Sequence, residues 1–228
     1  MSVNEMTTSG TEAALELARA IAAVDAADSS LGMLRAVAAL AQTRSTGAIV
    51  KLIEVLRYNN PGAAVAAVEG LVAIGEPSVL PLLELMDGYN YGARAWAMRA
   101  LSQIGDPRGL SVLLEALVDF SLSVRRAAAK GLGSLLWEAV EPGQLDGMRG
   151  QILEALSQSL CDDEWVVRYA SVVGLEGLAM GTIEFASAPG TELRDRVAIA
   201  LQKVATADSE VAVSTRATLA VRNLAEAG

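Results

Sequence analysis

The sequence predicts an all-helical solenoid, a right-handed superhelix of stacked helical hairpins, and three observations carry this prediction. Residues 89–108 nearly match the segment thirty positions earlier, so that Gly75 aligns with Gly105 and Pro77 with Pro107. Each glycine suits a left-handed helix C-cap, and each proline suits the first turn of a following helix. The chain is 52% hydrophobic but only 4% aromatic, with many Ala and Leu, and this composition favours helix. Such a repeat is typical of solenoid architecture.

The N-terminal part begins with a polar segment, 1–10, that we expect to be a disordered tail. Thr11 can cap a first helix that runs to about Val24, and Ser30 can cap a second helix over 31–42. In the segment 47–57 apolar residues recur at helical spacing and form one stripe. The members of this stripe are Ile49, Leu52, Ile53 and Leu56.

Similar helical patterns continue to the C-terminus. We expect helices over 121–136, 152–160, 165–179, 193–205 and 211–224, with longer connections over 141–150 and 180–190. This gives about five hairpins and an N-terminal helix. A single hairpin buries too little apolar surface to be stable alone, so the hairpins should stack as one domain over 11–228.

Composition excludes several kinds of function. The net charge is −9, which argues against nucleic-acid binding, and the chain has no His for zinc or histidine-based catalysis. The single Cys161 excludes a disulfide framework and fits a reducing compartment. Neither a signal peptide nor a membrane-spanning run is recognisable. Gly131 and Gly133 fit close helix packing better than phosphate binding.

Arginines recur near the starts of successive helices, where a solenoid places equivalent positions along one face. They are Arg94, Arg125, Arg126 and Arg168. Such a row could hold carboxylates through bidentate hydrogen bonds. In the alternative, structural reading, each arginine pairs with a neighbouring acid such as Asp87, Asp119 or Asp163.

Aromatic residues gather at the same helix ends. Of nine in the chain, five lie there, namely Tyr89, Tyr91, Trp96, Trp165 and Tyr169. Aromatic rings beside arginines suit either a flat, carboxylate-bearing ligand or a protein-binding hot spot. Trp96 points away from Arg94 on a helix, so it fits a core position equally well.

Five segments together resemble the HEAT-like repeats of bilin lyases, in particular the F-type subunits of heterodimeric phycocyanin alpha-subunit phycocyanobilin lyases. These segments are 59–68, 89–97, 104–108, 122–133 and 165–170. The resemblance covers roughly residues 30–180 and is most specific over 89–133. It implies a HEAT-like repeat fold.

The resemblance also implies an activity. Such a subunit pairs with an E-type subunit, binds phycocyanobilin as substrate, and attaches this open-chain tetrapyrrole through a thioether to a cysteine of the phycocyanin alpha subunit. It works in the cyanobacterial cytoplasm without a metal or further cofactor. Arginines would hold the two propionates and Asp87 the pyrrole nitrogens, so Asp87 and Arg94 are the expected catalytic residues. The expected ligand-binding residues are Tyr89, Asn90, Tyr91, Trp96, Arg125, Arg126, Trp165 and Arg168.

One subgroup of these lyases also isomerises the bilin with a His-Cys motif, which this chain lacks, so we expect no isomerase activity. Two alternatives stay open. One is a non-catalytic HEAT-repeat binding protein that escorts phycobiliproteins or promotes phycobilisome degradation, and the other is a scaffold with no pigment. The N-terminal helix carries few charges and several apolar residues, so another chain should cover it. These apolar residues are Leu15, Leu17, Ile21 and Val24.

Overall fold

The computed structural model describes residues 3–86, 91–181 and 189–227, and the regular elements within these ranges are all helical. The chain divides into two compact units, Met1–Ala100 and Leu101–Gly228. The all-helical prediction is confirmed. The assignment of 11–228 to a single domain and the handedness of the superhelix stay predictions.

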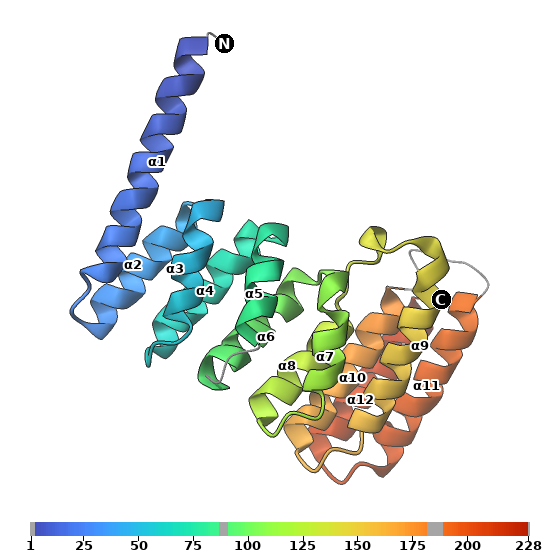
Figure 1. Ribbon diagram of the computed structural model, residues 1–228. Coiled ribbons are helices and arrows are strands. Elements are labelled where there is room, and N and C mark those ends of the chain that lie inside the picture. The colour runs from blue at the N-terminus through green and yellow to red at the C-terminus, as the bar shows by residue number, and fades with distance from the viewer. Residues whose placement is uncertain (1–2, 87–90, 182–188, 228) are drawn as a thin grey trace. The chain divides into compact units, whose positions relative to one another are not determined.

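The first unit consists of paired helices joined by short turns (Figure 1). Helix α2 packs against both α1 and α4, and α3 packs against α4 and α5. The fully buried side chains of this core include Leu40, Leu52, Leu71 and Leu82. The helices are α1 (Val3–Asp25), α2 (Ser30–Gln42), α3 (Ile49–Val55), α4 (Pro61–Ile74), α5 (Val79–Met86) and α6 (Tyr91–Ile104), with 3₁₀ turns at Thr46–Ala48 and Glu76–Ser78.

The second unit has two layers of helices (Figure 1). Helices α8, α10 and α12 lie side by side, whereas α9 and α11 cover them from one side. Leu132, Leu156 and Leu175 are among the largest fully buried side chains between them. The helices are α7 (Leu110–Ala116), α8 (Leu122–Leu132), α9 (Pro142–Ser159), α10 (Trp165–Met180), α11 (Pro189–Ala207) and α12 (Val211–Glu226), with 3₁₀ turns at Pro107–Gly109 and Trp137–Ala139.

The predicted capping signals are confirmed at equivalent points of the repeat. Gly75 and Gly105 end α4 and α6 with positive φ angles of 77° and 71°, which glycine adopts without a steric penalty. A 3₁₀ turn follows each glycine and leads into the next helix. Asn60 caps α4 by accepting a hydrogen bond from the backbone nitrogen of Ala63 at 3.1 Å.

Several boundaries differ from the prediction. Helix α1 begins at Val3, so it includes most of the segment 1–10 that we expected to be a tail, and Thr11 lies inside the helix instead of capping it. Segment 141–150 is not a connection, because α9 begins at Pro142. Its glycines at 143, 147 and 150 lower helix propensity, but Pro142 at the first position and the buried side chains further along stabilise the helix. Ser29, not Ser30, caps α2 by accepting from the Gly32 nitrogen. Helix α8 ends at Leu132 rather than 136, since the chain turns where α8 and α10 touch.

Glycines allow this close approach of α8 and α10, as the sequence predicted for Gly131 and Gly133. A Cβ added to Gly133 would lie 2.6 Å from the Cα of Gly174. A Cβ added to Gly174 would in turn meet the carbonyl oxygen of Ala129. A Cβ on Gly131 would clash with Ser102. Backbone therefore packs against backbone here, which only glycine permits.

Candidate functional site

The structure describes the predicted site residues unevenly. Asp87, Tyr89 and Asn90 lie outside the described residues, and so does the side chain of Tyr91, the first residue of α6. Arg94 is half-buried on α6. The role of each of these residues stays a prediction.

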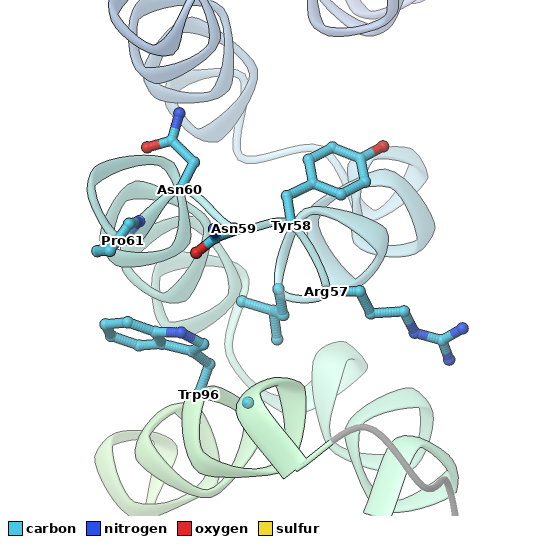
Figure 2. A pocket seen from close by; sticks show the side chains of 8 residues that line it. Arg57, Tyr58, Asn59, Asn60, Pro61 and Trp96 are labelled. Carbon is cyan, nitrogen blue, oxygen red and sulfur yellow. The ribbon is translucent and has the colours of Figure 1, made fainter.

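Trp96 lines a pocket instead of the core. This pocket has a volume of about 240 Å³ and lies in the first unit, between the turn that joins α3 to α4 and the start of α6. Figure 2 shows the indole of Trp96 facing Pro61 and Asn59, whereas the side chain of Arg57 extends away from it. We call this cavity the Trp96 pocket. Its lining residues are Leu56, Arg57, Tyr58, Asn59, Asn60, Pro61, Gly92 and Trp96.

Local hydrogen bonds hold the rim of the Trp96 pocket. Besides capping α4, Asn60 donates from its Nδ2 to the carbonyl oxygen of Ser30 at 3.0 Å. Tyr58 donates its hydroxyl to Glu54, and Lys51 bonds both Glu54 and Asp25. The hydrogen bond from Lys51 lowers the pKa of Glu54 below its usual value, and the bond to Glu54 raises the pKa of Tyr58. These contacts tie the α3–α4 turn to helices α1, α2 and α3.

Trp96 brings a flat aromatic surface with a nearby cation to the pocket. The guanidinium carbon of Arg99 lies 5.7 Å from the centroid of the Trp96 ring, within the range of a cation–π contact. Asn59 brings both a donor and an acceptor to the rim. The pocket can thus stack one planar ring against the indole and hydrogen-bond its polar edge. In the sequence Asn59 resembled an ordinary turn residue, and only its position one repeat before Tyr89 indicated a role.

Arg125 and Arg168 make the same set of contacts, one repeat apart, in the second unit. The Nε and Nη2 of Arg125 bond both carboxylate oxygens of Asp162 at 2.7 and 3.1 Å, and its Nη1 bonds the carbonyl oxygens of Asp119 and Phe120. Arg168 bonds both carboxylate oxygens of Asp208 at 2.8 and 3.0 Å. Its Nη1 bonds the carbonyl oxygens of residues 162 and 163.

These contacts join consecutive hairpins. Asp162 and Asp208 also accept hydrogen bonds from the backbone nitrogens of Glu164 and Glu210, at 2.9 Å in both cases. The bond with Arg168 lowers the pKa of Asp208, which is almost fully buried. Arg125 and Arg168 thus make the contacts of the structural reading, and the acids that pair with them are Asp162 and Asp208. A role of Arg125 and Arg168 in ligand binding stays a prediction.

The remaining candidates are exposed at the N-terminal ends of α8 and α10. Arg126 is exposed, and Trp165 and Tyr169, four residues apart on one face of α10, are 44% and 37% exposed. These three residues belong to the second compact unit, whereas the Trp96 pocket belongs to the first. Exposed aromatic side chains beside an arginine have the composition of a protein-binding hot spot.

One buried cation was not predicted from sequence. Arg149 of α9 is only 3% exposed and lies over the ring of Trp137 at 5.0 Å. Its Nε and Nη2 have no hydrogen-bond partner among the described residues. Burial lowers the pKa of this guanidinium, against the attraction of Asp146. No sequence pattern separates Arg149 from the exposed arginines.

Within the described parts of the chain, no group of three or more Cys, Asp or Glu side chains is arranged to hold a metal ion. Among the described helices, none is both long and apolar enough to cross a membrane.

Comparison with known proteins identifies the repeat. The family described as HEAT repeats matches residues 81–176. A HEAT-like repeats protein of Thermococcus onnurineus shares the fold, with a TM-score of 0.51 at 15% identity, over 92% of this chain and 87% of its own.

More similar proteins come from cyanobacteria. The phycocyanin alpha phycocyanobilin lyase CpcF of Synechocystis is 56% identical over 72% of this chain and 77% of its own length. A phycobilisome maturation protein of Synechococcus elongatus is 49% identical over 90% of this chain and 96% of its own. A chain in the complex of CpcE and CpcF of phycocyanin lyase from Nostoc matches with a TM-score of 0.69 at 43% identity, over 77% of this chain and 99% of that one. The chain therefore belongs to the family of HEAT-repeat phycocyanobilin lyase subunits.

Proposed function

We propose that this chain is the F-type subunit of a lyase that attaches phycocyanobilin to the phycocyanin alpha subunit. The observation that carries the proposal is its 56% identity to a phycocyanin alpha phycocyanobilin lyase. The partner is an E-type subunit, as in the CpcE and CpcF complex that the chain resembles at 43% identity. We place this reaction in the cyanobacterial cytoplasm, where the thiol of the acceptor stays reduced.

The chemistry requires no nucleophile from the lyase. A cysteine thiol of the acceptor adds across an exocyclic double bond of the bilin, so that one carbon–sulfur bond forms and the thiol proton moves to the neighbouring carbon. Nothing leaves, and nothing is oxidised or reduced. The lyase contributes by holding the bilin in a reactive geometry and bringing the thiol to it. Isomerisation is not part of the proposal, because the chain has no His.

The Trp96 pocket is our candidate for the bilin's first contact. A pyrrole ring can stack on the indole, and Asn59 can bond the ring's polar edge. Arg94 follows closely on α6, where its guanidinium would take a propionate. Asp87 precedes the same helix and would hold the cationic pyrrole nitrogens. Arg125 and Arg168 already bond carboxylates and carbonyls of the protein, so the exposed Arg126 is a stronger propionate candidate than either of them.

The E-type subunit would cover part of α1. Val24 is buried against the rest of the first unit, whereas Leu15 is 51% exposed on the same helix. An exposed leucine on an Ala-rich helix is a natural contact for a second chain. Replacing Leu15 by Asp should weaken co-elution of the two subunits without unfolding this chain.

Reconstitution with variants tests the proposed site. The purified chain, an E-type subunit, phycocyanobilin and apo-alpha phycocyanin are mixed, and bilin transfer is followed by absorbance. Trp96→Ala should slow transfer about tenfold, the loss expected for one stacking contact of about 1.4 kcal/mol. Arg94→Lys should weaken bilin binding without abolishing it, and Asp87→Asn should slow transfer. Phe120→Ala is the control for loss of an aromatic side chain, because Phe120 is exposed and is not among the candidate residues. Wild-type rates in folded Trp96, Arg94 and Asp87 variants would contradict the assignment.

A further inference from the structure

A second cavity lies in the second unit, and none of its lining residues is among those assigned above to bilin binding. It is a groove of about 600 Å³ between the C-terminal end of α9 and one face of α11. We call it the α9–α11 groove. Its lining residues are Ser157, Leu160, Cys161, Arg196, Ile199, Ala200, Lys203, Val204, Ala207 and Asp208. Cavities of this volume hold small organic ligands in many proteins.

Two cations stand on one side of the groove. Arg196 and Lys203 are seven residues apart on α11, so they share a face and are separated by about 10 Å along the helix axis. Both are exposed, and neither makes an ion pair or a hydrogen bond with another described side chain. The one acid among the residues that line the groove, Asp208, is bonded to Arg168. A chain with a net charge of −9 thus has a locally positive groove.

The surface between the two cations is apolar. Ile199 and Ala200 lie between Arg196 and Lys203 on α11, and Leu160 closes the groove from α9. Ile199 is 57% exposed, so burying its side chain under a ligand would be favourable. The complementary ligand has an elongated apolar body and two carboxylates about 10 Å apart.

We propose that the α9–α11 groove is a second bilin-binding site, in which Arg196 and Lys203 hold the two propionates. This inference rests on the proposed function, because it takes the ligand from the lyase's own substrate class. The two propionates sit on flexible two-carbon arms of neighbouring pyrrole rings, so they can reach cations with this spacing. This chain would then carry both the second bilin site and the proposed site from which the bilin is transferred to the acceptor.

Cys161 provides the test because it is exposed, lines the groove and is the one cysteine of the chain. The rate at which a thiol-reactive dye labels Cys161 is measured with and without biliverdin. Biliverdin has two propionates, and mesobiliverdin, whose vinyl groups are reduced to ethyl groups and cannot add to a thiol, checks that the protection is reversible. At a concentration ten times its Kd, biliverdin should slow labelling about tenfold. Its dimethyl ester, which has no carboxylate, should protect far less.

Variants separate a specific site from general shielding. Arg196→Ala combined with Lys203→Ala should remove the protection, each variant being compared with itself without bilin. Arg222→Ala is the matched control, because Arg222 is an exposed arginine of α12 outside the groove, and it should keep full protection. Equal protection in the double variant, or equal protection by the ester, would overturn the proposal. Protection by apo-alpha phycocyanin but not by biliverdin would also overturn it, in favour of a protein-docking groove.

The footprint needs neither the E-type subunit nor the acceptor. A failed footprint alongside normal bilin transfer would therefore reject the second site and leave the lyase function standing. Normal footprinting alongside no transfer would count against the lyase function instead.

Discussion

Replacing a glycine by alanine should lower the stability of the chain at the contact between α8 and α10 and raise it at an open position on α9. Replacing Gly174 by Ala adds a methyl group that meets the carbonyl oxygen of Ala129 and lies 3.1 Å from a methyl carbon of Leu156. The first neighbour is backbone, so the two helices must separate. We take an overpacking cost of about 3 kcal/mol. Alanine's better helix propensity returns about 1 kcal/mol. Gly174→Ala should therefore destabilise the chain by about 2 kcal/mol.

Gly147 is the matched control on α9, because no atom lies within 4 Å of the Cβ that alanine would add there. Gly147→Ala should stabilise the chain by about 1 kcal/mol, since only helix propensity changes. Both variants are compared with the wild type by thermal unfolding followed by circular dichroism. The Gly174 variant should melt about 4–8 °C lower and the Gly147 variant about 2–4 °C higher. Shifts of the same sign would refute the close-packing argument.

Three further predictions concern the ionic contacts. Arg168→Met should destabilise the chain by about 3 kcal/mol in urea unfolding, because it leaves the carboxylate of Asp208 buried without its cation. The pKa of Asp208 is lowered in the folded state, so its stabilising contribution is present above pH of about 4 and declines as the pH falls. The difference in stability between wild type and Asp208→Asn should accordingly shrink below that pH, and a constant difference would contradict the assignment. Arg149→Met should raise stability by about 1 kcal/mol, since it removes a buried charge that forms no ion pair with the described residues. A large loss of stability in the same urea assay would show that the contact with Trp137 outweighs the cost of burying the charge.

The elements that sequence predicted well are those set by local chemistry. Gly105 requires a left-handed conformation, and Asn60 with Pro61 starts a helix, so both signals are legible within a few residues of the chain. The first half of α9 was not predicted, because it lacks such local signals. Its three glycines and its polar residues lower local helix propensity, whereas its stability comes from tertiary burial of Ile152 and Leu153.

The candidate site was less predictable because its contacts are distant in sequence. Arg168 pairs with Asp208, forty residues away, rather than with the adjacent acid Asp163. Only the stacking register of the hairpins decides between these carboxylates. Trp96 faces Pro61 across a pocket for the same reason, and helical periodicity alone left it between core and surface. The α9–α11 groove likewise appears only when two outer helices are placed side by side.

The lyase function is tested most directly by leaving this chain out of the reconstitution. Apo-alpha phycocyanin and phycocyanobilin are incubated with the E-type subunit alone, with this chain alone, and with both. The products are separated on a denaturing gel, and zinc-induced fluorescence reports the bilin that stays bound covalently. We predict a fluorescent alpha-subunit band when both subunits are present and little or none with either one alone. An equally strong band without this chain would contradict its role as a lyase subunit.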